Sequence, residues 1–231
     1  MDVANASHYD GATAAAEAVV QAYNVFRGKR RRIIVAPTLH PHYREVIRTY
    51  TQGMALDIVG DEWDPDTPLS ELVGEVNKDT ACLILQSPNF LGQVEALDTL
   101  KEEIAARDSR ALLGVVTNPL SLGLFKPPGE YGADIVLGEG QPLGLGLNYG
   151  GPYLGFYATR DRYMRQISGR LVGKTVDVEG NEGYVMTLTT REQHIRRERA
   201  TSNICTNQGL MALAATAYMS ALGRHGLREV A

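Results

Sequence analysis

The segment best suited to chemistry is the stretch 138–152 (GEGQPLGLGLNYGGP), in which six of the 15 residues are glycine. Glycine tolerates backbone dihedrals that let a main chain approach a ligand or a neighbouring chain closely, so the stretch is a candidate binding loop. The alternative interpretation is a tight connection in a crowded sheet. The stretch is no nucleotide motif, because it has neither a GxGxxG sequence opening a helix nor a phosphate-binding Gly-Lys-Ser/Thr.

Lysine, the residue that forms Schiff bases with carbonyl compounds, is scarce in this chain. Only five of the 23 basic residues are lysine, and none of the five lies in 138–152. They are Lys29, Lys78, Lys101, Lys126 and Lys174. Chemistry that requires a lysine amine in the glycine-rich stretch is therefore excluded.

A densely charged run, 191–199 (REQHIRRER), is the second candidate. Its arginines would supply positive potential for a phosphate or a carboxylate. The alternative is an exposed, solvated face in which the arginines lie beside Glu192 and Glu198, with the next helix capped by Thr206 or Asn207. Nucleic-acid binding is disfavoured, because glutamates interrupt the run and the chain carries a net charge of −4.

Histidine and cysteine do not form a metal site in this sequence. His40 and His42 are two residues apart, and the other three histidines lack companions at ligand spacing. Cys82 and Cys205 are too far apart to suggest a disulfide framework or a metal knuckle. The sequence therefore predicts no metal and a reducing compartment.

Composition places the chain among ordinary globular proteins. Its 231 residues are 44% hydrophobic, which excludes a disordered chain and suffices for a packed core. No apolar run approaches the ~20 residues of a membrane span. The first residues show no basic region followed by an apolar one, so no secretory signal is visible and a cytoplasmic location is expected.

The elements that must position these candidates alternate between short apolar runs and amphipathic segments. Such alternation predicts a mostly parallel sheet with helices on both faces, a three-layer α/β/α fold. Expected strands are 32–36, 55–59, 82–85, 111–116, 133–137 and 153–158. Expected helices lie within 7–28, at 40–53, 70–77 and 95–107, from Arg160 onward, and at 208–222 with Gly223 as its stop.

Ligands of such sheets bind beyond the carboxyl ends of the strands. The candidate loops are therefore 37–42, 86–92, 117–121 and 138–151. Residues 170–203 are polar and predict an extended arm. We divide the chain into a large domain, 1–207, and a helix-bearing segment, 208–231, expected to lead toward a small C-terminal domain that is largely absent.

Four segments together resemble one family. They are 4–13 (ANASHYDGAT), 86–92 (QSPNFLG), the glycine-rich stretch and 184–208 (YVMTLTTREQHIRRERATSNICTNQ). The chain resembles the amino-terminal subunit of glycine dehydrogenase (decarboxylating), the P-protein of the glycine cleavage system, over essentially its whole length. The resemblance implies the large domain of a pyridoxal-phosphate-dependent transferase of the aspartate-aminotransferase type.

The resemblance also implies that the cofactor belongs to a second, carboxy-terminal subunit. In such domains the catalytic lysine follows a strand and precedes a glycine-rich loop, and here Gln141 lies near that position. An amide nitrogen cannot form the Schiff base. The acid that would pair with the pyridinium nitrogen is expected on the strand 111–116, which carries none. We therefore expect no cofactor on this chain.

The start of the first helix leads to the same expectation. In this fold the cofactor phosphate is usually held by the free amides at that helix end. Asp10 stands there with Thr13 three residues on, where a carboxylate would cap the amides and repel a phosphate. Asp10 as a plain N-cap explains the residue equally well.

The functional expectation is a non-catalytic subunit that completes its partner's active site. The partner would decarboxylate glycine and pass the aminomethyl group to the lipoyl H-protein. In related folds a Thr or Ser before the helix after the arm reaches the neighbour's cofactor phosphate, which nominates Thr201, Ser202 and Asn203. The substrate or interface candidates are His194, Arg196, Arg197 and Arg199. Two alternatives stay open: an autonomous pyridoxal-phosphate enzyme that uses Lys126, and a purely structural interaction domain.

Overall fold

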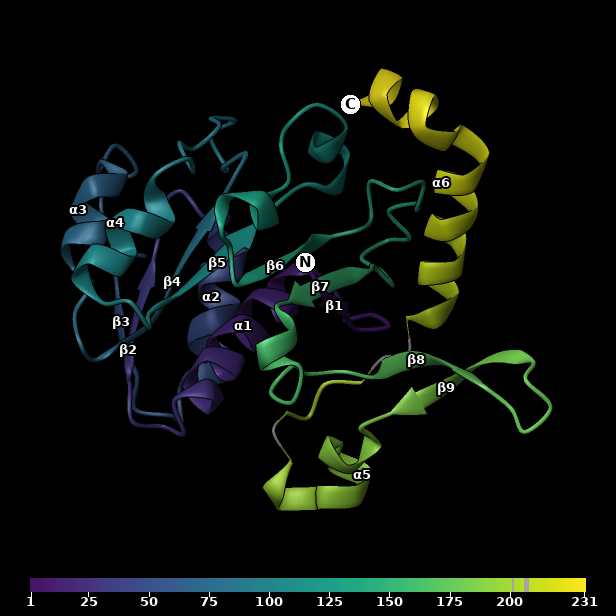
Figure 1. Cartoon of the computed structure of the whole chain (residues 1–231). Helices are drawn as coiled ribbons and strands as arrows, with labels where there is room; N and C mark the ends of the chain where they lie inside the picture. Colours follow the sequence, from purple (N-terminus) through teal and green to yellow (C-terminus); the bar gives the residue numbers. More distant parts are fainter. Residues whose placement is uncertain (201, 206–207) are drawn as a thin grey trace.

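The computed structural model describes residues 1–200, 202–205 and 208–231. Its centre is a seven-stranded sheet in the order β1-β7-β6-β5-β4-β2-β3 (Figure 1). The strands β2, β3, β4, β5 and β6 run parallel, whereas β7 runs antiparallel to β6 and the edge strand β1 pairs antiparallel with β7. The strands are β1 (Val3–Ala4), β2 (Arg32–Val35), β3 (Asp57–Val59), β4 (Thr80–Gln86), β5 (Leu112–Val116), β6 (Ile135–Glu139) and β7 (Gly155–Thr159).

Helices cover both faces of this sheet. Successive residues of a strand face opposite sides, so apolar side chains on each face pack against a layer of helices. Ile33 and Ile84 face one cluster with α1 (Gly11–Val25) and α2 (Pro41–Thr51). Their neighbours Ile34 and Leu83 face a second cluster with α3 (Leu69–Gly74) and α4 (Leu100–Arg107). The central strands are apolar on both faces, as buried parallel strands are. The predicted three-layer α/β/α fold is confirmed.

Two structural details differ from the expected helices before the arm. The helix expected over 95–107 begins only at Leu100, because Glu95 is tied to the loop after β4: its amide donates to Ser87 Oγ at 3.2 Å, and its carboxylate accepts from Asn89 Nδ2 at 2.8 Å. The prediction of a helix from Arg160 onward was wrong. Only a 3-10 turn, Asp161–Tyr163, is present, since the chain returns to the core at Ile167.

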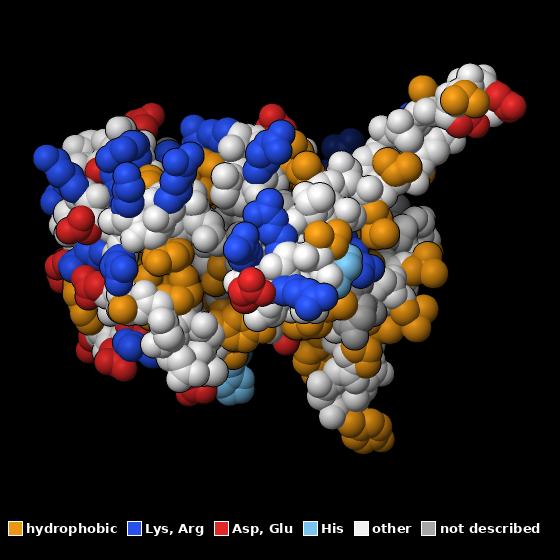
Figure 2. Space-filling view, turned by 90° about the horizontal axis from the view of Figure 1, so that it is seen from below, with side chains coloured by type: hydrophobic (Ala, Val, Ile, Leu, Met, Phe, Trp, Pro, Cys, Tyr) orange, Lys and Arg blue, Asp and Glu red, His pale blue; other side chains and the backbone are white. Residues whose placement is uncertain are grey.

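The expected arm contains a two-stranded hairpin, β8 (Leu171–Val176) and β9 (Glu182–Thr187), which projects from the body of the molecule (Figure 1). Short turns follow it: Thr189–Arg191, α5 (Gln193–Arg196) and Arg197–Arg199. Apolar side chains of the hairpin face solvent, among them Val176, Tyr184 and Met186. In Figure 2 the hairpin extends at the right as a thin projection with hydrophobic side chains along it, whereas Lys and Arg gather on the body.

The last helix, α6 (Gly209–Val230), packs against the glycine-rich stretch (Figure 1). Gly223 interrupts α6 with φ 61° and ψ −173° but does not end it, so the predicted stop is a kink within a longer helix. Gly144 has φ +80°, and a Cβ placed there would lie 2.4 Å from Tyr218 of α6. This glycine therefore allows close contact within the chain, as the crowded-connection alternative predicted.

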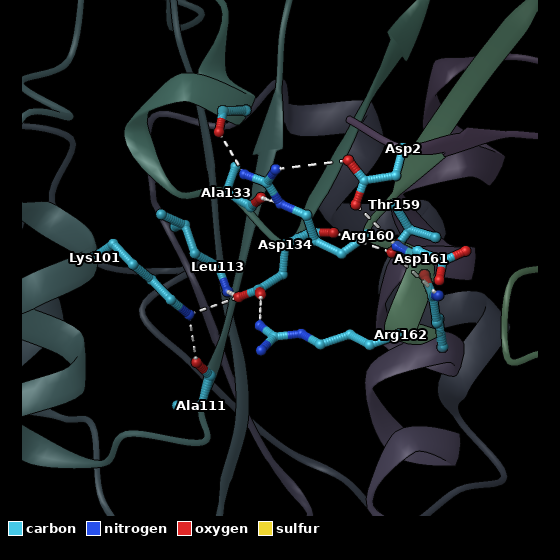
Figure 3. Close-up of polar contacts among 12 residues, drawn as sticks. Asp2, Lys101, Ala111, Leu113, Ala133, Asp134, Thr159, Arg160, Asp161 and Arg162 are labelled. Atoms are coloured by element: carbon cyan, nitrogen blue, oxygen red, sulfur yellow. Dashed lines mark hydrogen bonds and ion pairs between the residues drawn. The ribbon is translucent and has the colours of Figure 1, made fainter. Parts of the chain in front are cut away.

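The amino ends of β5 and β6 are joined through the buried carboxylate of Asp134, which is 1% exposed (Figure 3). Lys101 Nζ and Arg162 Nη2 each lie 2.6 Å from one of its oxygens. The amide of Leu113 donates to it at 3.0 Å. A buried charge with two cations and a backbone donor is satisfied, whereas the removal of one partner of such a group is costly.

We expect Asp134→Ala to lower the free energy of unfolding by about 3 kcal/mol, because Lys101 and the Leu113 amide lose their buried acceptor. Urea denaturation monitored by circular dichroism measures this loss. The exposed Asp66 provides the control, since Asp66→Ala should leave the midpoint within ~0.5 kcal/mol of the original protein. Equal midpoints for the two variants would contradict the assigned role of Asp134.

Candidate functional site

The carboxyl ends of β2, β4, β5 and β6 meet at one edge of the sheet, and hydrogen bonds link the loops that leave them. The His40 amide donates to Gln86 Oε1 at 3.0 Å, joining the loops after β2 and β4. Thr117 Oγ1 donates to the Ser87 carbonyl at 2.9 Å, joining those after β4 and β5. Three of the four strand-end loops nominated from the sequence, those after β2, β4 and β5, are therefore linked at the carboxyl edge of the sheet.

The amino end of α1 lies at this edge and is closed by its own residues. Asp10 Oδ1 accepts from the Thr13 amide at 2.7 Å, and Thr13 Oγ1 accepts from the Asp10 amide at 3.3 Å. This pair is a capping box, so the predicted N-cap role of Asp10 is confirmed.

A second carboxylate, that of Glu139 at the end of β6, lies at the same helix end. Its Oε2 accepts from the Gly11 amide at 2.9 Å. Its Oε1 accepts from the amides of Gln141 and Leu154 at 2.8 and 3.0 Å. Burial raises the pKa of Glu139, and these amide bonds oppose that rise. Sequence reasoning missed this residue, because nothing in a lone glutamate within a glycine-rich stretch indicates which distant amides it will meet.

Gln141 lies two residues beyond Glu139, and its side chain forms a hydrogen bond within the same loop. Its Nε2 donates to the Leu145 carbonyl at 2.6 Å. The side chain thus stabilises the turn after β6, and as an amide it offers no nucleophile.

The segment after the arm is anchored to the start of the chain and to α1. Ser202 Oγ donates to Glu17 Oε1 at 2.5 Å, and the Cys205 amide donates to the Tyr9 hydroxyl at 2.9 Å. Asn203 lines a hollow beside Tyr23 and Tyr50. Thr201, named with them from the sequence, lies outside the described residues, as do the alternative caps Thr206 and Asn207.

Residues 193–199 of the charged run are exposed, and several members of the run contact one another. His194 Nδ1 lies 3.5 Å from Glu192, and Arg199 Nε lies 3.9 Å from Glu198. Arg196 Nε donates to the Thr190 carbonyl at 3.0 Å, and Arg197 is exposed with φ +53°. These arginines are therefore open to a ligand or partner that approaches from solvent.

Comparison with known protein families matches residues 1–231 to the family described as glycine cleavage system P-protein. The chain belongs to the glycine cleavage system P-protein family. It is 53% identical over 232 residues to a probable glycine dehydrogenase (decarboxylating) subunit 1 of Desulforamulus reducens. It is also 53% identical over 239 residues to a protein of the same name from Thermomicrobium roseum. Each match covers 100% of this chain but 51% of the relative, so the chain spans about half the length of these curated relatives.

Solved structures support this family and the fold. A crystal structure of glycine decarboxylase (P-protein) of the glycine cleavage system, in inhibitor-bound form, superposes with a TM-score of 0.90 at 45% identity, covering 99% of this chain and 51% of that one. An aspartate aminotransferase of Thermus thermophilus superposes with a TM-score of 0.60 at 19% identity, covering 98% of this chain and 58% of that one. At that identity the likeness shows the fold alone, which is that of pyridoxal-phosphate-dependent enzymes of fold type I.

The residues of this P-protein chain do not fit the cofactor of that fold. Two carboxylates, those of Asp10 and Glu139, bond the amides at the amino end of α1, where a phosphate dianion would be repelled. The Tyr43 hydroxyl packs directly against Gly11, since a Cβ placed on Gly11 would lie 2.1 Å from it. Strand β5 is apolar throughout and offers no acid to a pyridinium nitrogen.

No group of three or more His, Cys, Asp or Glu among the described residues could hold a metal ion. In the same part of the P-protein chain, no helix has the length and apolar character needed to cross a membrane. Both cysteines are free thiols, with Cys82 buried and Cys205 half-buried.

Glu17 forms the most strongly perturbed carboxyl group near the arm. It is 3% exposed, and burial raises its pKa from an ordinary 4.5 to about 7, against the lowering effect of the hydrogen bonds from Ser202 and Ser168. Ser168 also contacts the buried His8, whose pKa burial lowers to about 3. A neutral imidazole and a protonated carboxyl group therefore lie beneath the anchored segment at acidic pH.

The pKa of Glu17 predicts a specific pH dependence of stability. Because the folded-state pKa exceeds the unfolded value, the protonated group favours folding below pH 4.5, and this contribution is lost as the pH rises through 7. Glu17→Gln, which stays neutral, should gain about 3 kcal/mol relative to the original protein between pH 4.5 and 8. Chemical denaturation at a series of pH values measures the difference, and the exposed Glu45→Gln should show none. A constant difference for Glu17→Gln would contradict the shifted pKa.

Proposed function

We propose that this chain is a non-catalytic subunit of a pyridoxal-phosphate-dependent glycine decarboxylase. In this proposal the chain completes the active site of a carboxy-terminal subunit. That subunit binds the cofactor and glycine, releases carbon dioxide and passes the aminomethyl group to the lipoyl H-protein carrier. The single observation that carries the proposal is Gln141: an amide bonded to the Leu145 carbonyl stands near the position where the fold type requires a lysine amine.

The surface of the chain supports a subunit role. A two-stranded hairpin is marginally stable on its own, and β8–β9 exposes apolar side chains that include Val172, Val176 and Tyr184. Exposed contiguous apolar surface is typical of a contact with another chain. The family relatives named above are called subunit 1, which is consistent with a second subunit as the partner.

The arm would supply the chain's contribution to the partner's site. Arg196, Arg197 and Arg199 are exposed and positively charged, as contact with a phosphate or carboxylate requires. Thr201, Ser202 and Asn203 remain the candidates for contact with the partner's cofactor phosphate, and a hydrogen bond to Glu17 holds Ser202 against α1. His194 remains an interface candidate. The cytoplasmic location likewise stays a prediction, supported by two unpaired cysteines.

The autonomous-enzyme alternative would have to use Lys126, which lines a small pocket with Ser87, Thr117 and Tyr131. Lys126 lies between β5 and β6, outside the glycine-rich stretch, and its Nζ lies 4.2 Å from the centre of the Tyr131 ring, a cation–π contact. The glycine-rich stretch, where the resemblance places the Schiff-base lysine, contains none of the five lysines.

The isolated chain should therefore fail to trap the cofactor. We expect no visible absorption band after incubation with pyridoxal phosphate and dialysis, and no lysine adduct after borohydride reduction, as measured by mass spectrometry of the peptides. The partner subunit, treated in parallel, serves as the positive control. A stoichiometric adduct on Lys126 or on any other single lysine would overturn the proposal.

The partner role is tested by reconstitution with the carboxy-terminal subunit and an assay of glycine-dependent carbon dioxide exchange. Activity should require both chains. Arg196→Ala and Thr201→Ala should weaken retention of pyridoxal phosphate in the complex, because they remove groups assigned to the shared site, while Lys126→Ala should be without effect. A purely structural chain would instead give complexes in which all three variants match the original rate and cofactor content.

A further inference from the structure

The carboxylate of Glu139 accepts hydrogen bonds from three backbone amides, one in its own loop and two in segments farther from it in the chain. Gly11 belongs to the start of α1, Gln141 to the glycine-rich stretch and Leu154 to the return into β7. All three donors lie 2.8–3.0 Å from its two oxygens, which is ordinary hydrogen-bond length. One side chain therefore satisfies three backbone amides at once.

The charge of Glu139 is balanced by main chain. Among the ion pairs of the residues that the structure describes, none involves Glu139; its donors are the amides named above. Convergent amides at the positive end of a helix make the kind of site that binds phosphate or carboxylate ions in other proteins. The Tyr43 ring, packed against Gly11, and the capping carboxylate of Asp10 close the site from the helix side.

We infer that Glu139 is a built-in anion: its carboxylate occupies a main-chain anion site and holds α1, the glycine-rich stretch and β7 in one arrangement. The inference concerns this chain alone and does not depend on the proposed partner. The inference explains why the site does not fit the cofactor: the amides that could receive a phosphate already bond a residue of the chain.

A simpler interpretation treats Glu139 as one more half-buried residue whose loss would only loosen a loop. The two interpretations differ in what repairs the loss. If the three amides form an anion site, a small carboxylate added from solution should replace the missing side chain. If Glu139 merely fills space, added anions should affect the variant and the original protein alike.

The test is the thermal unfolding of Glu139→Ala in sodium formate, in sodium phosphate and in sodium chloride of equal ionic strength. We expect the variant to unfold several degrees below the original protein in chloride. Formate should then recover about half of that loss or more, saturably, as binding to the folded state requires. Phosphate should recover less, because it is larger and meets the charge of Asp10. The original protein and the exposed Glu130→Ala should show only the general salt effect in all three solutions.

Two further variants sharpen the result. Glu139→Gln keeps the volume but loses the charge and places an NH2 group against one amide, so it should fall between the original protein and Glu139→Ala, and formate should not rescue it. Adding Asp10→Asn to Glu139→Ala should tighten phosphate binding, because one negative charge is removed while the cap is kept.

A response of Glu139→Ala to formate no greater than that of the original protein would overturn the inference, as would equal stability of the two in chloride. Where Glu139→Ala does not accumulate as a folded chain, refolding from urea replaces the melt. Recovery of folded protein in formate but not in chloride then supports the inference, and equal recovery in both overturns it.

Discussion

The meeting of one carboxylate with three backbone amides is the constraint on which the strand-end edge depends. Glu139 ends β6 and bonds the amides of Gly11, at the start of α1, and Leu154, just before β7. Because β6 and β7 pair in register from Ile135 to Glu139, this contact also sets the antiparallel edge of the sheet. At the edge where this fold type binds its ligands, the chain instead has hydrogen bonds between its own carboxylate and its own amides.

The fold was largely predictable from the sequence, because each buried parallel strand is a short apolar run and each helix carries its own signals. Asp10 and Thr13 announce the start of α1, and the structure shows the expected capping box. Contacts between distant segments limited the prediction elsewhere. Glu95 has good helix propensity, but its hydrogen bonds to the loop after β4 hold it outside α4. Propensity is local, whereas such bonds exist only after folding.

The site shows the same division. The absence of a lysine from the glycine-rich stretch can be read from the sequence, because a residue type that is missing from a segment is also missing from the loop which that segment forms. The sequence does not show in the same way which side chain bonds the amides at the start of α1. Glu139 has no sequence neighbour that reveals its partners, since Gly11 lies 128 residues away. The anchoring of Ser202 by Glu17 was hidden for the same reason, with 185 residues between them.

The projecting hairpin also bears on solubility. Among the described residues, β8 and β9 pair in a sheet of two strands, so each has an outer edge without a neighbouring strand, beside exposed valines. Such an edge is a template for further strands, and a net charge of −4 gives little repulsion between copies. The same projection that suits a subunit contact would make an unpaired chain prone to self-association, so the amount of soluble chain should follow the supply of whatever covers the hairpin.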